Sequence, residues 1–213
     1  MILPEHEAKR LLAEADIPVI PAESIHSIEE AKTRARAIGQ PVALKLSTAL
    51  HSHKTDVGGV VLNISEMIEL EKAYVRLTEL RERLDPQAAI VIEPMADAGV
   101  ELFVGVQRHE AFGPVLGLGL GGIWVELVKD VAFCLLPASR SDFRRTLSEL
   151  KSWPKLREGF RHLPAVDDEP VMDFLESIAA FASNHPEVSE MDLNPVMIHP
   201  GGAVVVDARI VIG

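Results

Sequence analysis

Apolar residues at helical spacing, or capping residues that begin helices, mark five stretches of the chain. The predicted helices cover residues 3–15, 27–39, 65–84, 141–150 and 171–182. Ser27 and Glu30 have the spacing of a capping box at the start of the second helix, and Gly39 is where that helix stops. Ser65 is the predicted cap of the third helix.

Shorter apolar runs rich in β-branched residues predict strands between these helices. The predicted strands cover residues 41–46, 58–64, 89–93, 100–107, 114–120, 124–128 and 131–136, and a terminal hairpin of residues 190–198 and 203–210. This order predicts an α+β fold in two lobes. The N-terminal lobe is expected over residues 1–92 and the C-terminal lobe over residues 93–213, and they meet near Pro94.

The terminal hairpin places polar residues in register. A four-residue loop at residues 199–202 puts Asn194 opposite Asp207 and Asp192 opposite Arg209 in an antiparallel pair. An amide oxygen beside a carboxylate is a hard-oxygen site of the kind that holds Mg²⁺ together with substrate phosphates. A polar, solvated sheet face with one Asp–Arg pair explains the same spacing, so both interpretations stay open.

Lys45 interrupts the apolar strand at residues 41–46. Alternation puts Val42, Leu44 and Leu46 on one face of the strand and Lys45 on the other. A buried ammonium group needs a partner. The spacing favours a phosphate and a carboxylate equally.

The polar loop at residues 51–60 ends in Gly58 and Gly59. Consecutive backbone amides near paired glycines can cradle a phosphate. Imidazole is a competent phosphoryl acceptor, so the loop histidines are candidates for that chemistry. A solvent loop made of turn residues is the alternative interpretation.

The glycine-rich segment at residues 112–122 fits neither of the common phosphate-binding motifs. No Gly-Lys-Ser/Thr follows it, and no helix follows its strand as a dinucleotide-binding fingerprint requires. Its glycines instead allow a close approach of backbone or of a flat ligand to a strand. Glu126 and Asp130 are either site carboxylates or parts of a hydrated turn, and Cys134 is expected in the core.

Composition narrows the class of protein. The 213 residues include 21 Lys+Arg and 32 Asp+Glu, and the net charge of −11 argues against binding to nucleic acid or to an anionic membrane. The single cysteine excludes an internal disulfide framework. The apolar runs are too short to span a bilayer and Met1 opens no signal-peptide pattern, so we expect a cytoplasmic protein.

Several motifs in a fixed order make the sequence more specific. They are Lys45, residues 53–60 (His-Lys-Thr-Asp-Val-Gly-Gly-Val), 112–115 (Phe-Gly-Pro-Val), 119–126 (Gly-Leu-Gly-Gly-Ile-Trp-Val-Glu), 129–133 (Lys-Asp-Val-Ala-Phe), 192–195 (Asp-Leu-Asn-Pro) and 207–209 (Asp-Ala-Arg). Together they resemble the ATP-grasp domain of NDP-forming acyl-CoA synthetases. That family includes the β subunit of ADP-forming acetate–CoA ligase and, more distantly, the β subunit of succinyl-CoA synthetase.

The resemblance implies an ATP-grasp fold whose two lobes clasp ATP or ADP. The implied reaction interconverts acyl-CoA, ADP and phosphate with free acid, CoA and ATP through acyl-phosphate and phosphohistidine steps. Lys45 matches the phosphate-binding lysine, and Glu101 matches a carboxylate on the nucleotide side. Glu93, Pro94 and Met95 match the segment between the lobes that contacts adenine.

The same resemblance implies a metal and a phosphate carrier. Asn194 and Asp207 match the Mg²⁺ ligands, in agreement with the hairpin register. His53 matches the loop histidine that carries phosphate between the sites of two subunits. The family's Ser-Pro-Asp-like run before that histidine is replaced here by residues 48–52, Thr-Ala-Leu-His-Ser, and a Gly-x-Arg-Gly segment appears at residues 159–162 without its second glycine.

A partner follows from what the sequence lacks. It contains no CoA-binding Rossmann domain, so the resemblance implies a CoA-binding ligase subunit or fused domain, in a hetero-oligomer, that binds CoA and the carboxylic acid. The alternative is a noncatalytic, nucleotide-sensing ATP-grasp domain of a larger regulatory or acetyltransferase-like protein. Intact Lys45, His53, Asn194 and Asp207 favour the enzyme.

Overall fold

The computed structural model describes residues 1–50, 54–122, 129–159, 161 and 163–213. The chain divides into two compact units, each built on its own β-sheet. The N-terminal unit comprises Ile2–Arg10 and Ile20–Ala96, and the C-terminal unit comprises Met1, Leu11–Val19 and Asp97–Gly213. Helix α1 (Glu5–Glu14) contributes its beginning to the first unit and its end to the second.

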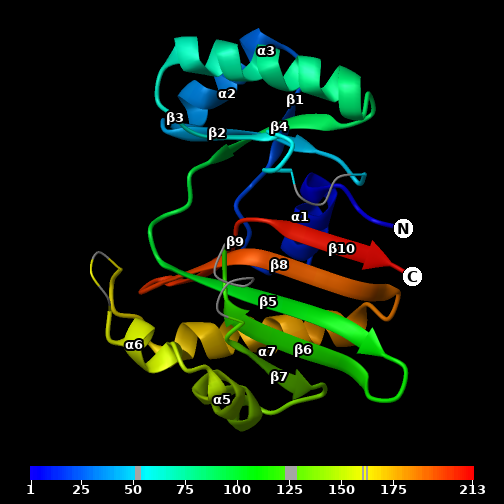
Figure 1. Cartoon of the computed structure of the whole chain (residues 1–213), viewed down its shortest axis with the longest axis vertical. Helices are drawn as coiled ribbons and strands as arrows, with labels where there is room; N and C mark the ends of the chain where they lie inside the picture. Colours follow the sequence, from blue (N-terminus) through cyan, green and yellow to red (C-terminus); the bar gives the residue numbers. More distant parts are fainter. Residues whose placement is uncertain (51–53, 123–128, 160, 162) are drawn as a thin grey trace. The chain divides into compact units, whose positions relative to one another are not determined.

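A four-stranded antiparallel sheet forms the N-terminal unit (Figure 1). In spatial order its strands are β1 (Glu23–Ile25), β4 (Ala89–Pro94), β2 (Val42–Ser47) and β3 (Val60–Ile64). Helices α2 (Ile28–Ile38) and α3 (Met67–Leu84) cover one face of this sheet.

Alternation along β2 separates the two faces of that sheet. Val42, Leu44 and Leu46 are at most 1% exposed and belong to the apolar cluster beneath α2 and α3. Their removal from water is the main favourable term in forming this layer. Lys45 lies on the opposite face, where Glu93 of β4 also projects, and the predicted alternation is therefore confirmed.

The capping residues explain where the helices of this unit begin. Ser27 caps α2 as predicted, since its side chain accepts a hydrogen bond from the Glu30 amide. The predicted cap of α3 is wrong by one residue, because Glu66 and not Ser65 occupies that position. The Glu69 carboxylate accepts hydrogen bonds from the amides of Ser65 and Glu66, which satisfies donors that the helix leaves unpaired.

A second antiparallel sheet forms the C-terminal unit (Figure 1). In spatial order its strands are β10 (Ala208–Ile212), β8 (Val188–His199), β5 (Val100–His109), β6 (Gly113–Leu120) and β7 (Val131–Leu135), and β9 (Gly202–Val205) also pairs with β8. Helices α5 (Arg140–Glu149), α6 (Trp153–Arg157) and α7 (Asp168–Asn184) complete the unit. Phe174, Leu175 and Ile178 form the buried face of α7, as the spacing predicts.

Two short elements, β1 and α6, are not predicted from the sequence, and the predicted strand at residues 124–128 lies outside the described residues. Asp130 supports the start of α6, because its carboxylate accepts hydrogen bonds from the amides of Lys151 and Ser152 and from the Ser152 hydroxyl. Burial opposes ionisation of Asp130, but these hydrogen bonds hold its pKa below the usual value. Asp130 therefore has a structural role at this turn, and its part in a site stays a prediction.

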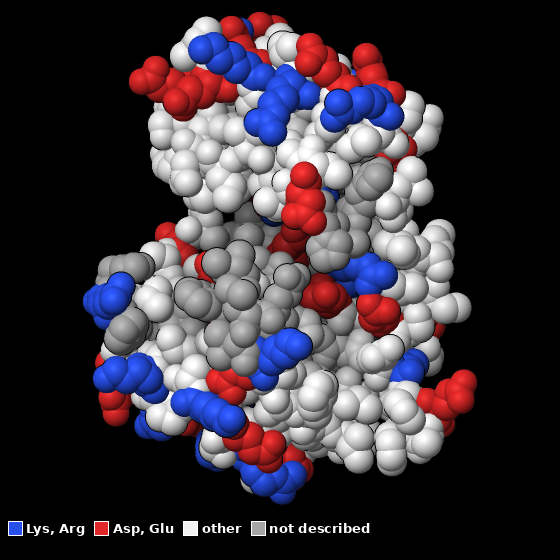
Figure 2. All heavy atoms as spheres, in the orientation of Figure 1, with Lys and Arg blue, Asp and Glu red and all other residues white. Residues whose placement is uncertain are grey.

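Charged residues cover the outward sides of the described helices. On the face drawn in Figure 2, acidic and basic side chains are interspersed. Some of them pair on the surface: Lys32 contacts Glu29 and Glu71, and Arg34 contacts Glu23. Within the described parts of the chain, no helix combines the length and the apolar character needed to cross a membrane.

Cys134 lies in the core of the C-terminal unit, as predicted. It is a β7 residue, it pairs with Leu116 of β6, and it is 6% exposed. A small, weakly polar side chain suits such a position.

Candidate functional site

The C-terminal hairpin has the register that the sequence predicts. Asp192 pairs with Arg209, and the Asn194 amide donates a 3.1 Å hydrogen bond to the Asp207 carbonyl. The turn is tighter than predicted, because His199 pairs with Gly202 across it. Asn194 and Asp207 are thus opposite one another at the point where β9 gives way to β10.

Gly122 brings two oxygen-bearing side chains of this unit to one place. Its amide donates a 2.8 Å hydrogen bond to Asn194 Oδ1, and a Cβ added to it would collide with Glu101 Oε2. Its φ of 61° lies in the left-handed region that glycine adopts without a steric penalty. Glu101 is exposed and Asn194 and Asp207 are partly exposed, so solvent reaches all three. We call Glu101, Asn194 and Asp207 the oxygen-donor group.

The oxygen-donor group has the chemistry that a hard divalent cation requires. Amide and carboxylate oxygens are the preferred protein ligands of Mg²⁺, which usually retains water and substrate oxygens as well. Asn194 Oδ1 accepts one hydrogen bond from Gly122, and an amide oxygen has a second lone pair. Among the described residues no group of three or more His, Cys, Asp or Glu side chains could hold a metal. A cation at this place would therefore need Asn194 together with Asp207, and water or ligand oxygens besides.

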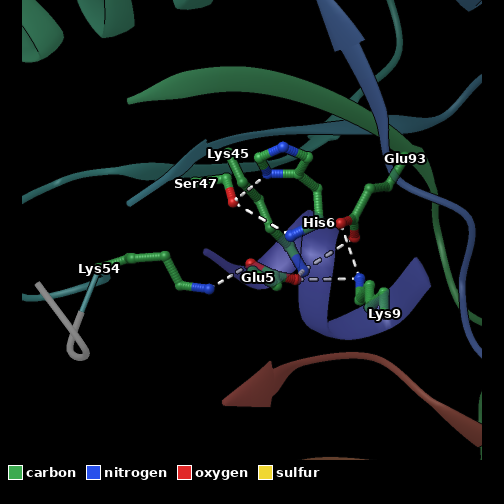
Figure 3. A network of polar contacts seen from close by, with 7 residues as sticks. All are labelled: Glu5, His6, Lys9, Lys45, Ser47, Lys54 and Glu93. Atoms are coloured by element: carbon green, nitrogen blue, oxygen red, sulfur yellow. Dashed lines mark hydrogen bonds and ion pairs between the residues drawn. The ribbon is translucent and has the colours of Figure 1, made fainter. Parts of the chain in front are cut away.

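Five buried charged residues contact one another in the N-terminal unit (Figure 3). Lys45 Nζ lies 2.9 Å from Glu5 Oε1 and 2.8 Å from Glu93 Oε2. Lys9 Nζ lies 2.9 Å from Glu5 Oε1 and 2.7 Å from Glu93 Oε1. Lys54 Nζ donates a hydrogen bond to Glu5 Oε2. We call these residues the ion cluster; their side chains are at most 7% exposed.

The ion cluster is assembled from four separate segments. Glu5 and Lys9 come from α1, Lys45 from β2, Glu93 from β4 and Lys54 from the turn before β3. Among its described members, three ammonium groups meet two carboxylates. Such a cluster attracts anions, because opposite charges interact strongly where water is excluded.

The two carboxylates of the cluster respond differently to their surroundings. Burial alone would raise the pKa of Glu5, but the ammonium groups of Lys9, Lys45 and Lys54 outweigh it and hold that pKa well below its usual value. Burial raises the pKa of Glu93, and the nearby Glu5 carboxylate adds to the rise, whereas Lys9 and Lys45 oppose it. Glu5 is therefore the carboxylate that is firmly ionised.

His6 adjoins the ion cluster but contacts a neutral partner (Figure 3). Its Nδ1 lies 2.8 Å from Ser47 Oγ, and its backbone amide donates to the same oxygen at 3.1 Å. Burial lowers the pKa of His6 below its usual value. The two contacts fix the start of α1 against β2, next to Lys45.

The predicted nucleotide-binding residues of the N-terminal unit have the following places in the structure. Lys45 and Glu93 are ion-paired, so a carboxylate is one partner of Lys45. Pro94 and Met95, which follow Glu93, are half-buried. His53 lies outside the described residues.

Gly58 and Gly59 have a different local role from the predicted phosphate cradle. The Gly58 amide donates to the Thr55 carbonyl at 3.0 Å, and the Gly59 amide donates to the Lys54 carbonyl at 2.7 Å. Both amides are thus used inside the turn and hold the backbone of Lys54. Their contact with a nucleotide stays a prediction.

Glu5 and Lys9 are site residues that the sequence pattern does not predict. Their spacing of four residues places them on one side of α1, the same side as Ala8 and Leu12, which have no exposed surface. Two charges within an apolar helical stripe are a readable signal that they have buried partners. Their partners, however, lie up to 84 residues away in the chain.

Comparison with known families gives the class of the protein. A model of the ATP-grasp domain family matches residues 1–212, and the chain belongs to that family. The α+β fold and the resemblance inferred from the sequence are confirmed.

Curated relatives include ADP-forming acetate–CoA ligases of archaea. Acetate–CoA ligase [ADP-forming] II of Archaeoglobus fulgidus is 40% identical over 100% of this chain and 31% of its own length. The β subunit of acetate–CoA ligase [ADP-forming] II of Pyrococcus furiosus is 37% identical over 98% of this chain and 90% of its own length. The chain thus spans about a third of the first relative and nearly all of the second.

Solved structures of acetyl-coenzyme A synthetase 1 from Ca. Korarchaeum cryptofilum share the fold. The complex with coenzyme A, Ca-AMPCP and HgCl⁺ has a TM-score of 0.92 at 41% identity and covers 100% of this chain and 93% of that chain. A second complex contains coenzyme A and Mg-AMPPCP, and its phosphohistidine segment points towards the nucleotide binding site. It has a TM-score of 0.83 at 40% identity and covers 98% of this chain and 92% of that chain.

Proposed function

We propose that this chain is the ATP-grasp subunit or domain of an ADP-forming acyl-CoA synthetase. The reaction is reversible: acid, CoA and ATP give acyl-CoA, ADP and phosphate by way of a phosphohistidine. The observation that carries this proposal is the match to a β subunit of almost the same length, with 98% of this chain aligned to 90% of that subunit.

In this proposal the ion cluster binds the nucleotide phosphates. Lys45 supplies a fixed positive charge, and Lys54 lies within the same cluster. Phosphoryl transfer depends mainly on positioning and on neutralising charge, which buried cations do well because they need no reorganisation. Glu93, Pro94 and Met95 then contact adenine, and Gly58 and Gly59 border the phosphates.

The oxygen-donor group is the proposed Mg²⁺ site of the C-terminal unit. Asn194 and Asp207 are the ligands, and Glu101 is the neighbouring carboxylate on the nucleotide side. Bound Mg²⁺ would neutralise charge on the phosphate oxygens. The hydrogen bond from Gly122 orients the Asn194 amide oxygen before any ligand arrives. The proposed lobes remain residues 1–92 and residues 93–213.

His53 is the proposed phosphate carrier. It precedes Lys54 in the sequence, and Lys54 belongs to the ion cluster. A bond forms between a ring nitrogen of His53 and phosphorus while the bond from phosphorus to the previous carrier breaks. The nitrogen–phosphorus bond then breaks when a later acceptor takes the phosphoryl group. CoA and the carboxylic acid bind mainly to a partner subunit or fused domain in a hetero-oligomer, which we expect in the cytoplasm.

A labelled-phosphate experiment tests the activity. The chain is incubated with γ-labelled ATP, Mg²⁺ and its CoA-binding partner, and acid-labile phosphohistidine is measured. We expect label on the chain in the wild type and in His51→Ala, and its loss in His53→Ala. Transfer that is undiminished in His53→Ala would remove the carrier role.

A binding experiment tests the metal site and the alternative function. We expect Mg-ATP to bind more weakly to a variant with both Asn194→Ala and Asp207→Ala than to the wild type. Unchanged affinity would contradict the assignment of these ligands. Nucleotide binding without any phosphate transfer, in the presence of the partner, would instead indicate the nucleotide-sensing function.

A further inference from the structure

Glu5 occupies the centre of the ion cluster (Figure 3). Its Oε1 lies 2.9 Å from both Lys9 Nζ and Lys45 Nζ, and its Oε2 accepts a hydrogen bond from Lys54. Glu93 contacts Lys9 at 2.7 Å and Lys45 at 2.8 Å. Glu5 is thus the carboxylate that connects the lysine of β2 with the lysine of the turn before β3.

The charge on Glu5 is permanent over the ordinary pH range. Its side chain is 2% exposed, and the surrounding ammonium groups hold its pKa well below the usual value in spite of burial. An ionised carboxylate offers two oxygens about as far apart as two oxygens of a phosphate group. Carboxylates and phosphates are also the two anions that lysine ammonium groups bind most often in proteins. A phosphate at Lys45 and Lys54 therefore competes with Glu5.

Glu5 would still contact Lys9 if it lost its contacts with Lys45 and Lys54. Lys9 lies one turn further along α1, so the two residues move together with their helix. Lys45 likewise has a second carboxylate partner, since Glu93 Oε2 lies 2.8 Å from its Nζ. The exchange of Glu5 for a phosphate oxygen thus leaves no carboxylate of the cluster without a cation.

We propose that Glu5 sets the affinity of this site for phosphate groups: it holds Lys45 and Lys54 while no phosphate is bound, and it gives them up to phosphate oxygens while keeping Lys9. This proposal rests on the proposed nucleotide site at the ion cluster. Glu5 is an affinity-determining residue that acts through the lysines and does not itself touch the reacting atoms.

The variant Glu5→Gln removes the competing charge and keeps the shape of the side chain. We expect it to bind Mg-ADP and inorganic pyrophosphate about tenfold more tightly than the wild type, because one screened unit charge next to the ligand is gone. Adenosine, which has no phosphate, should bind with unchanged affinity. Titration calorimetry on the full chain measures all three ligands.

Two control variants separate the local effect from a general one. Glu5→Asp keeps the charge and should restore an affinity near that of the wild type. Glu29→Gln makes the same change of net charge on α2, at a side chain that is 78% exposed, and should change the affinity for Mg-ADP by less than about twofold because salt and water screen exposed charges. Weaker binding in Glu5→Gln, or an equal change for adenosine, would overturn the proposal.

The wild type supplies a test that does not depend on a folded variant. A crystal structure with Mg-ADP should show the contact between Glu5 and Lys54 broken and the contact between Glu5 and Lys9 intact. If both contacts persist with phosphate bound at Lys45, Glu5 is no competitor and the proposal is wrong.

The failure of this proposal and that of the proposed function are distinguishable. If Mg-ADP does not bind the wild type but pyrophosphate binds more tightly to Glu5→Gln, the nucleotide site is wrong and the competing role of Glu5 stands. If Mg-ADP binds and Glu5→Gln does not tighten it, the function stands and the role of Glu5 is wrong. Absence of binding by both ligands would remove both proposals.

Discussion

The ion cluster and the oxygen-donor group differ in how far their polar side chains are buried. In the ion cluster the side chains are almost completely buried, and Glu5 and Glu93 each contact two or more lysines. In the oxygen-donor group the side chains reach solvent, and a hydrogen bond from the Gly122 amide orients the Asn194 amide oxygen. The first group is assembled before a ligand arrives, whereas the second is left open.

The difference shows which part of each group the fold itself requires. A buried charge must have its partner, since removing one member leaves another uncompensated in a medium of low dielectric constant. A solvent-exposed oxygen has no such requirement, because water replaces a missing partner. Substitutions in the ion cluster should therefore change stability strongly, while those in the oxygen-donor group should change mainly the affinity for a cation.

The largest effect is expected for Glu5→Gln. Three ammonium groups would then face one carboxylate, and we expect the free energy of unfolding to fall by about 3–5 kcal/mol. Urea unfolding followed by circular dichroism measures it. The matched control is Arg140→Gln, which removes a partly exposed charge that contacts Glu169, Asp173 and Glu176 on α7. A loss in Glu5→Gln no greater than in Arg140→Gln would erase the distinction between buried and exposed clusters.

A smaller loss of stability is expected for Gly122→Ala. The φ of 61° is unfavourable for alanine by about 1–2 kcal/mol, and the new methyl group would also push Glu101 aside. The control is Gly113→Ala, where φ is 73° and an added Cβ meets no atom within 4 Å. Gly122→Ala alone should also weaken the binding of Mn²⁺, measured by electron paramagnetic resonance. Equal behaviour of the two variants would show that Gly122 does not arrange the oxygen-donor group.

Acid should weaken the contribution of Glu5 to stability. Its pKa is lower in the folded chain than in the unfolded chain, so its contribution is present above about pH 4.5 and is lost as the pH falls towards the folded-state pKa. The difference in unfolding free energy between wild type and Glu5→Gln should shrink on acidification from pH 5 to pH 3, by at most about 1.4 kcal/mol per pH unit. For Glu93→Gln the sign is reversed: the pKa of Glu93 is raised, so its difference should shrink as the pH rises above about 4.5. Two differences of the same sign would contradict the assignment of the two carboxylates.

The smallest effect on stability is expected for Asn194→Ala. It leaves the Gly122 amide without its side-chain acceptor, which we expect to cost about 1 kcal/mol. Asn194→Asp retains an acceptor oxygen and should recover both the stability and the affinity for Mn²⁺. If Asn194→Ala binds Mn²⁺ as the wild type does, the oxygen-donor group is not the metal site.

The features that the sequence predicts correctly are those set by local spacing. The register of the C-terminal hairpin depends on a turn of few residues, so Asn194 and Asp207 are found opposite one another. The face of Lys45 follows from alternation within a single strand. Capping residues locate α2 to within a residue, and only the cap of α3 is misplaced.

The features that the sequence does not predict depend on contacts between distant segments. The spacing of Glu5 and Lys9 signals burial, but only the folded chain shows that their partners are Glu93 and Lys45. The amides of Gly58 and Gly59 likewise suit a phosphate cradle until their hydrogen bonds within the turn are known. Burial and hydrogen-bond partners are properties of the tertiary fold, and spacing along the chain does not report them.

The reactivity of Cys134 can report on local opening of the C-terminal unit. Cys134 is the single thiol among 213 residues, and it is buried within β7. A thiol reagent modifies such a side chain only when the structure around it opens, so the modification rate measures how often that opening occurs. The modification rates with and without a bound nucleotide would show whether the ligand makes the opening around Cys134 rarer.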